Sequence, residues 1–289
     1  MAHDPEIEIA ASARSISKQI DRLLPRADGP ESLLADAMRH ALLDQGQCFH
    51  GYLVCASSEL FAVDPYRAMR AAVAAECAFA YSRIHDDLPC MDNVNIRHGR
   101  TTVHVEFDEA TAILAGDALL SLAFELLADE ATHQDPSVRC GLVTGLSGAA
   151  GGHGAAGGQL HDLLPAAMNA GIGEVTRLQQ MKSGALIAFS CEAGGLLGHA
   201  SGVARHALRA FAHDLGLAHQ IASDIRSLEN ADGAEKSNSK ATFVTVLGLD
   251  RARTQAQYLA NQSRQHIDIF DNNAVSLNLA VDFISSQCE

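Results

Sequence analysis

The chain has 289 residues, of which 47% are apolar, and a formal net charge of −14. The apolar fraction is sufficient for a buried core, and the negative charge excludes nucleic acid and anionic membrane surfaces as main partners. The seven cysteines show no C-x-x-C pair, as is typical of reduced thiols. The stretch MAHDPEIEIA lacks the basic region and apolar run of a signal peptide, and we find no apolar stretch long enough to span a bilayer. We therefore expect a cytoplasmic protein without stable membrane insertion.

Apolar residues recur at helical spacing along most of the chain. One predicted helix, over 64–87, begins with Asp64 as its N-cap and Pro65 at its first helical position. The other predicted helices span 31–43, 108–130, 138–164, 172–197, 203–228, 240–259 and 274–286. The sequence shows no low-complexity linker and no internal repeat, and it therefore predicts one all-α domain over residues 1–289.

Three aspartates, Asp86, Asp87 and Asp92, end a predicted helix in the stretch YSRIHDDLPCMDN. Because Pro89 cannot continue that helix, we expect the chain to bulge and to bring Asp92 back beside Asp86. Clustered carboxylates repel one another unless a cation lies between them, and Mg²⁺ takes oxygen ligands together with substrate phosphates. The alternative is a solvated acidic helix end. Arg97, in RHGRTT, favours the binding site because it adds a cation for an anionic ligand.

The same region resembles a known family. The stretch RIHDDLPCMDNVNIRHGRTTVHVEFDEATAILAGDALLSLAFELL resembles the first aspartate-rich region of the trans-polyprenyl diphosphate synthases, which include farnesyl and geranylgeranyl diphosphate synthases. The resemblance continues in GGQLHDL, MKSGALI and SKATFVTVLGLDRAR. It implies the isoprenoid synthase fold, a helical bundle around a deep central cavity. It also implies Mg²⁺-dependent ionisation of an allylic prenyl diphosphate, followed by attack from isopentenyl diphosphate.

The resemblance assigns the residues that would contact the allylic substrate. The implied catalytic cations are Arg97, Lys182 and Lys240, because a leaving diphosphate needs its developing charge neutralised. The sequence shows no evident protein partner for these three cations. Other implied contacts are Gln159, Ser183 and Gln220. Tyr81 stands where short-chain members carry the bulky residue that caps the tail pocket, which implies a C10 or C15 diphosphate.

The resemblance also assigns metal ligands. Asp86 and Asp92 would hold Mg²⁺, with Asp87 in support. The second aspartate-rich motif of the family, DDILD, stands here as SDIRS. The second set of implied ligands is Asp224, Ser223 and Ser227. Read onward, SDIRSLENAD partly matches a metal motif of class I terpene synthases. An exposed, well-capped helix end is the open alternative for this stretch.

The cations that bind isopentenyl diphosphate in the family are missing here. The family pattern GGGKRLRP stands as DQGQCFHG, so Gln47, Cys48 and His50 replace a Lys and two Arg. Phe79 replaces a His, and His98 replaces an Arg. Each change removes a phosphate ligand or leaves a His that is mostly neutral at pH 7. We therefore expect a weakened site for this second substrate.

Three functions remain open. The favoured one is ionisation of a single allylic diphosphate without coupling, as in terpene synthases. The first alternative is a chain-elongating prenyl diphosphate synthase whose remodelled acceptor site uses His50 and His98. The second is a non-catalytic subunit that modulates an active synthase. The resemblance implies a homodimer. For a non-catalytic subunit, the corresponding assembly would be a heterodimer with an active synthase. Arg83, where the family commonly has an apolar residue, has no explanation from the sequence.

Overall fold

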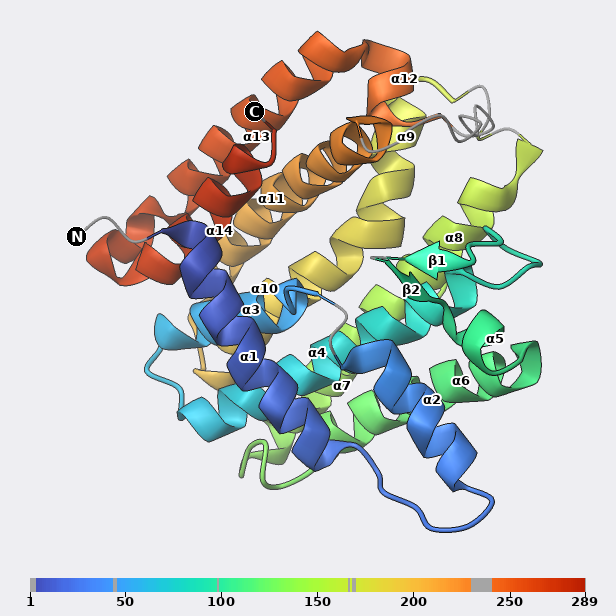
Figure 1. Cartoon of the computed structure of the whole chain (residues 1–289). Helices are drawn as coiled ribbons and strands as arrows, with labels where there is room; N and C mark the ends of the chain where they lie inside the picture. The colour runs from blue at the N-terminus through green and yellow to red at the C-terminus, as the bar shows by residue number, and fades with distance from the viewer. Residues whose placement is uncertain are drawn as a thin grey trace.

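The computed structural model describes residues 4–43, 46–97, 99–165, 167, 170–229 and 241–288 (Figure 1). Its helices are α1 (Pro5–Leu23), α2 (Ser32–Leu42), α3 (Phe49–Glu59), α4 (Pro65–Asp86), α5 (Val103–Glu106), α6 (Glu109–Ala128), α7 (Pro136–Ala150), α8 (Ala155–Leu163), α9 (Ile172–Gln179), α10 (Ala185–Leu197), α11 (Gly202–Glu229), α12 (Phe243–Leu247), α13 (Leu249–Ile267) and α14 (Val275–Ser286). A π-helical turn, η2 (Gln180–Gly184), joins α9 to α10, and a 3₁₀ segment, η3 (Asp268–Ala274), precedes α14. The predicted all-α class is confirmed.

Several helices begin at the same short signal, an aspartate followed by a proline. Asp64 accepts hydrogen bonds from the backbone N–H groups of Tyr66 and Arg67, and Asp4 and Asp135 cap α1 and α7 in the same way. The side chain satisfies a free N–H group, and the proline has none to satisfy. The predicted start of the helix over 64–87 is therefore confirmed.

Three of the predicted helices are interrupted. The segment 138–164 is two helices, because the chain turns between α7 and α8; a Cβ atom on Gly154 would lie 2.1 Å from the carbonyl oxygen of Ala149. The segment 240–259 is broken at Gly248, whose φ of +81° suits glycine. The segment 172–197 contains the π-helical turn η2. The breaks at Gly154 and Gly248 depend on backbone contacts and backbone conformation, which a pattern of apolar residues does not report.

The strands in the described ranges are two short antiparallel ones. β1 (Ile96–Arg97) pairs with β2 (Arg100–Thr101), with Arg97 opposite Arg100. Gly99, between the strands, has a φ of +75°, which an L side chain rarely adopts. The hairpin follows the three aspartates, and Arg97 on β1 lies against Asp87, the C-cap of α4.

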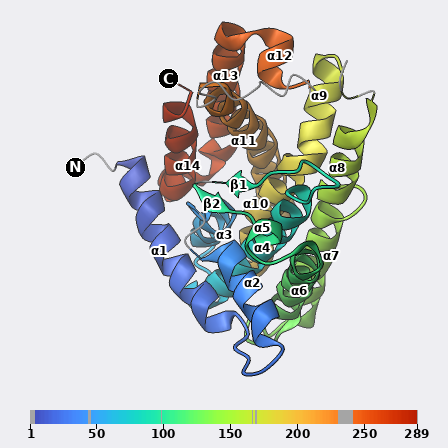
Figure 2. The same ribbon diagram turned by 45° about the vertical axis from the view of Figure 1, so that its right-hand side comes forward.

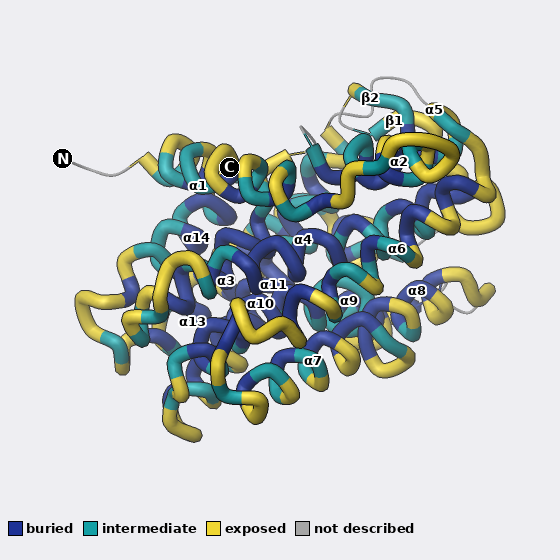
Figure 3. Tube along the Cα trace, turned by 90° about the horizontal axis from the view of Figure 1, so that it is seen from below, coloured by how far each residue is buried: buried dark blue, intermediate teal, exposed yellow. Residues whose placement is uncertain are grey.

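The centre of the bundle is made of α4, α10 and α11, which are largely buried (Figure 3). Four alanines of α4, at positions 71, 72, 74 and 75, are at most 1% exposed, and such small side chains allow α3 and α6 to approach closely. α11 packs along α13, and α1 lies beside α14, so the first and last helices of the chain are neighbours (Figure 2).

Contrary to the expectation that no apolar stretch is long enough, α6 could cross a membrane by length and composition, the one such helix among the described residues. It packs against α2, α4 and α7, as a core helix does. One of its faces nevertheless leaves Ile113 and Leu114 44% and 57% exposed. The homodimer expected from the sequence stays a prediction, as does the cytoplasmic location.

Candidate active site

The three aspartates lie in a turn that follows α4. Asp86 is the last residue of the helix and Asp87 is its C-cap. The backbone N–H of Asp92 donates to the carbonyl oxygen of Asp86 at 2.9 Å, and that of Val94 donates to Asp87 at 3.1 Å. The expected bulge after Pro89 is therefore present, and it returns Asp92 to the end of the helix.

The return of Asp92 affects the ionisation of Asp86. Burial raises the pKa of Asp86 to about 6; Lys182 opposes the rise, and the nearby carboxylate of Asp92 adds to it. A carboxyl group in this environment is stabilised in its charged form by a further cation. The turn thus has the electrostatic character of a cation site.

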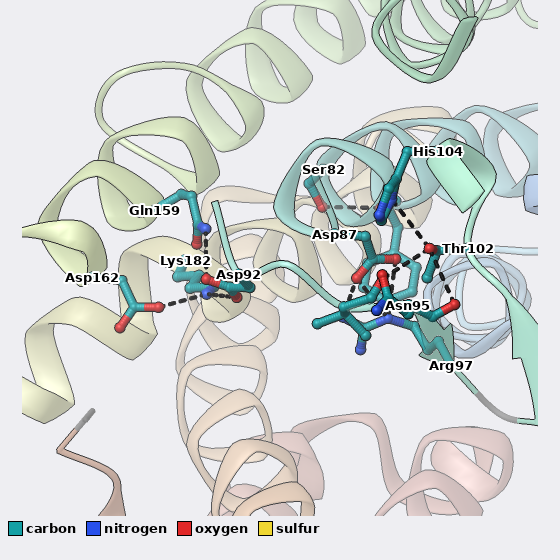
Figure 4. Close-up of polar contacts among 12 residues, drawn as sticks. Ser82, Asp87, Asp92, Asn95, Arg97, Thr102, His104, Gln159, Asp162 and Lys182 are labelled. Atoms are coloured by element: carbon teal, nitrogen blue, oxygen red, sulfur yellow. Dashed lines mark hydrogen bonds and ion pairs between the residues drawn. The ribbon is translucent and has the colours of Figure 1, made fainter. Parts of the chain in front are cut away.

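Lys182, which lies in η2, is close to this turn (Figure 4). Its Nζ donates to Asp162 Oδ2 at 2.7 Å and lies 3.7 Å from Asp92 Oδ2. Gln159 approaches the same carboxylate, with Nε2 3.5 Å from Asp92 Oδ1. The sequence expectation that Lys182 lacks a protein partner is wrong. Asp162, which is buried, was missed, although it lies in the quoted stretch GGQLHDL.

Local backbone features place these groups. Lys182 lies in the π-helical turn η2, and such turns are frequent at functional sites. A Cβ atom on Gly158 would lie 2.4 Å from the backbone nitrogen of Lys182, so α8 approaches η2 closely only because this residue is glycine. The close approach sets Gln159 and Asp162, on α8, against Lys182.

Arg97 and Asp87 form the second charged pair of the site. Arg97 Nε donates to Asp87 Oδ1 at 3.0 Å, and Nη2 donates to the same oxygen at 2.5 Å. The carboxylate is only 7% exposed, and Figure 4 shows the pair apart from the group around Lys182. Arg97 therefore has a protein partner, contrary to expectation. Its guanidinium holds the helix end in place and occupies Asp87, which was expected to support the metal.

The residues expected around the second motif form a hydrogen-bonded chain. Ser183 Oγ donates to Gln220 Oε1 at 3.0 Å, and Gln220 Nε2 donates to Asp224 Oδ1 at 2.8 Å. The other oxygen of Asp224 accepts from the backbone N–H of Phe243 at 3.0 Å. Burial raises the pKa of Asp224 to about 6, and these hydrogen bonds oppose the rise. The chain links η2, α11 and α12.

The two serines of SDIRS are less engaged. Ser227 Oγ donates to the carbonyl oxygen of Ser223, one turn back in α11. Both residues line the cavity described below.

Tyr81 makes an edge-to-face contact with His85, with ring centroids 4.9 Å apart. Lys240 and His98, both assigned roles from the sequence, lie outside the described residues.

The residues present fit a magnesium ion in part. No group of three His, Cys, Asp or Glu side chains in the described ranges is placed to hold a metal ion alone. Mg²⁺, however, usually binds through one or two carboxylates and keeps water and substrate phosphates as its other ligands. Asp86 and Asp92 supply two carboxylates. Beside them, the buried Oε1 of Gln159 has no hydrogen-bond partner among the described residues, which suits an ordered water of such an ion.

A cavity of about 940 Å³ adjoins this site, and Arg97 lies on the wall that faces it. The positions where family cations are missing come together in its lining: Gln47, Cys48, His50 and Phe79. Three arginines also line it, and we call it the arginine cavity: Arg83, Arg97 and Arg226. Arg83 was noted as unexplained, and Arg226 lies within SDIRS, but the sequence did not indicate that they share a cavity.

His50, one of the two histidines in this lining, is not a cation near neutral pH. His50 stacks on Phe79, with ring centroids 4.3 Å apart. Burial lowers the pKa of His50 to about 3, and His219 and Arg83 contribute to the lowering. The role of conditional phosphate ligand, considered for His50 from the sequence, is therefore not supported by its surroundings.

Comparisons with known proteins agree with the fold and the motifs. Residues 31–272 match the family model described as Polyprenyl synthetase. The chain is 32% identical to the farnesyl diphosphate synthase of Geobacillus stearothermophilus, over 95% of each chain. It is 33% identical to that of Escherichia coli (strain K12), over 90% of each. A crystal structure of an FPP/GFPP synthase from Zymomonas mobilis matches 99% of this chain and 100% of that chain, with a TM-score of 0.90 and 41% identity, which confirms the isoprenoid synthase fold. The chain belongs to the polyprenyl synthetase family.

Proposed function

We propose that the chain is a short-chain prenyl diphosphate synthase, which joins an allylic diphosphate to isopentenyl diphosphate. The two relatives described above are named farnesyl diphosphate synthases, which favours chain elongation over the uncoupled ionisation that the sequence analysis preferred. The coupling reaction needs room for two diphosphates, whereas uncoupled ionisation needs room for one.

One observation carries the proposal: the arginine cavity adjoins the aspartate turn. The two regions meet at Arg97, which pairs with Asp87 and also lines the cavity. A cation-lined cavity of about 940 Å³ is large for the tail of one substrate that is already bound at the turn. A second anionic substrate accounts for both its size and its arginines.

The residues around the aspartate turn have separate roles in this reaction. Asp86 and Asp92 would hold Mg²⁺, which supplies charge neutralisation for a leaving diphosphate when it is bound. Lys182, held by Asp162 at 2.7 Å, places its ammonium group where negative charge develops on that diphosphate. Ser183 and Gln220 hold η2 against α11 and thereby fix the position of Lys182.

The test is incubation of the purified protein with Mg²⁺ and geranyl diphosphate, with and without isopentenyl diphosphate, followed by analysis of diphosphate and hydrocarbon products. We expect an elongated diphosphate only when isopentenyl diphosphate is present. Hydrocarbon or alcohol with released pyrophosphate, independent of isopentenyl diphosphate, would instead support a terpene-synthase-like enzyme. No reaction under either condition would point to a modulating subunit.

A further inference from the structure

The arginine cavity contains cations at positions that the family pattern leaves apolar. Gln47, Cys48 and His50 have lost the charges of the loop before α3. Arg83, on α4, stands where the family commonly has an apolar residue, and Arg226 stands at the leucine of DDILD. Both gained charges line the same cavity as the lost ones. Losses and gains at unconnected sites would not be expected to meet in one cavity.

Arg83 makes no hydrogen bond or ion pair with a carboxylate among the described residues. Its Nη2 donates to the carbonyl oxygen of Ala41 at 2.9 Å, and its guanidinium lies 5.4 Å from the ring centroid of Phe79. Burial lowers the pKa of Arg83 and the positive charge of Arg97 adds to this effect, while the carboxyl groups of Asp87 and Glu76 oppose it. A buried guanidinium without a counter-ion is costly to keep, and a bound anion would remove that cost.

Arg226 reaches the same cavity from α11, and the structure gives it no hydrogen bond or ion pair with a described residue. His219 lies two turns earlier on that helix and also lines the cavity. Its Nδ1 atom is buried and has no hydrogen-bond partner in the described part of the chain. Two cations and one unsatisfied ring nitrogen therefore face a space that no described protein group fills.

The carboxyl group in the lining, Glu76, interacts electrostatically with Arg83 but forms no ion pair with it. Glu76 accepts a hydrogen bond from the backbone N–H of Gly51 at 2.7 Å, and burial raises its pKa to about 7. Asp87, the other acid nearby, is occupied by Arg97. Among the described residues, therefore, no carboxylate forms an ion pair with Arg83 or Arg226, and a bound anion would supply that charge.

We infer that Arg83 and Arg226 together bind the diphosphate of the second substrate, in place of the cations missing from the loop before α3. The planar guanidinium donates two parallel hydrogen bonds to phosphate oxygens, which a histidine or glutamine cannot do. This inference rests on the proposed function for the identity of the ligand, an isoprenoid diphosphate with a short apolar tail. The anchor of that substrate is thereby moved from a loop onto two helices of the bundle.

The experiment is a calorimetric titration with isopentenyl diphosphate in EDTA. Without a divalent metal the aspartate turn should not bind a diphosphate, whereas the arginine cavity needs none. The variants are Arg83→Leu and Arg226→Leu, and the matched control is Arg209→Leu on α11, because Arg209 pairs with Glu192 at 3.0 Å outside the cavity. Leucine at position 83 is of the apolar type usual in the family, and circular dichroism checks that each variant folds.

We expect the wild type and Arg209→Leu to bind, and each cavity variant to bind roughly tenfold to a hundredfold more weakly. Arg83→Lys should lie between them, because it keeps the charge and loses the paired hydrogen bonds. Unchanged binding by both leucine variants, or no metal-free binding by the wild type, would overturn the inference. If the wild type binds as expected but makes no elongated product, the proposed function fails and the inferred anchor stands.

Discussion

The aspartate turn and the arginine cavity adjoin each other, but they bind charge in opposite ways. At the turn, protein carboxylates gather around Lys182, and the region needs a cation to complete it. In the cavity, Arg83 and Arg226 form no ion pair with a described carboxylate, and the region would accept an anion. Arg97, neutralised by Asp87, separates the two. A metal-bound diphosphate and a metal-free diphosphate can therefore be held side by side.

The comparison also shows that a binding site can be retained either with the residues of its family or with different residues that supply the same charge. The turn keeps the residue types of its family at the expected positions. The cavity has lost its expected cations and holds others that project from α4 and α11. A phosphate site is defined by the charge that reaches a given space, and not by the position in the chain that supplies it.

The largest effect is expected for Lys182→Ala. Loss of one preorganised donor at a developing charge should lower kcat about a hundredfold or more. Lys18→Ala, at an exposed position on α1, is the matched control and should behave as the wild type. The measurement is steady-state pyrophosphate release with geranyl and isopentenyl diphosphates. A kcat within a few-fold of the wild type would remove Lys182 from the catalytic machinery.

The next effect concerns stability and is expected from Glu76→Gln. Because burial raises the pKa of Glu76 from 4.5 to about 7, the folded state holds this proton more tightly than the unfolded state does. Its contribution is therefore favourable below about pH 4.5 and is lost as pH rises to about 7. Relative to Glu76→Gln, the free energy of unfolding of the wild type should fall by on the order of 3 kcal/mol across this range.

Denaturant unfolding of both proteins at pH 4.5 and pH 7.5, without metal or substrate, gives this difference. Glutamine can still accept from the N–H of Gly51, so the hydrogen bond itself is retained. A pH-independent difference between the two proteins would mean that Glu76 stays charged in the cavity. In that case it would neutralise Arg83 and weaken the argument for a bound anion.

A further stability effect, of similar or smaller size, is expected for Gly158→Ala. The new Cβ atom would lie 2.4 Å from the backbone nitrogen of Lys182, so α8 and η2 must separate. Overpacking of this kind costs about 1–3 kcal/mol in the free energy of unfolding. Gly173→Ala is the control, because nothing lies within 4 Å of the corresponding atom. Equal unfolding midpoints would show that the close approach of α8 does not position Lys182.

Much of the aspartate turn could be predicted, because its chemistry is local in sequence. Asp86, Pro89 and Asp92 are neighbours along the chain, and the helix end and the bulge follow from their order. The partners of Lys182 could not be predicted in the same way. Asp162 is 20 residues away, and its approach depends on a missing side chain at Gly158.

The arginine cavity was less predictable still. Arg83 and Arg226 are far apart in sequence, and each lies in a stretch whose family pattern offers an apolar residue. Only the packing of the bundle places both side chains in one cavity. The sequence therefore indicated a weakened second site, because the missing cations were visible in a motif and the added ones were not.

The most direct test of the two-site account compares Asp92→Ala with Arg83→Leu in two binding measurements. One uses an unreactive thiolo analogue of geranyl diphosphate with Mg²⁺, and the other uses isopentenyl diphosphate in EDTA. The account predicts that Asp92→Ala weakens only the first ligand and that Arg83→Leu weakens only the second, each by roughly tenfold or more. If both variants weaken the same ligand and leave the other unchanged, the turn and the cavity are one site, and the account is contradicted.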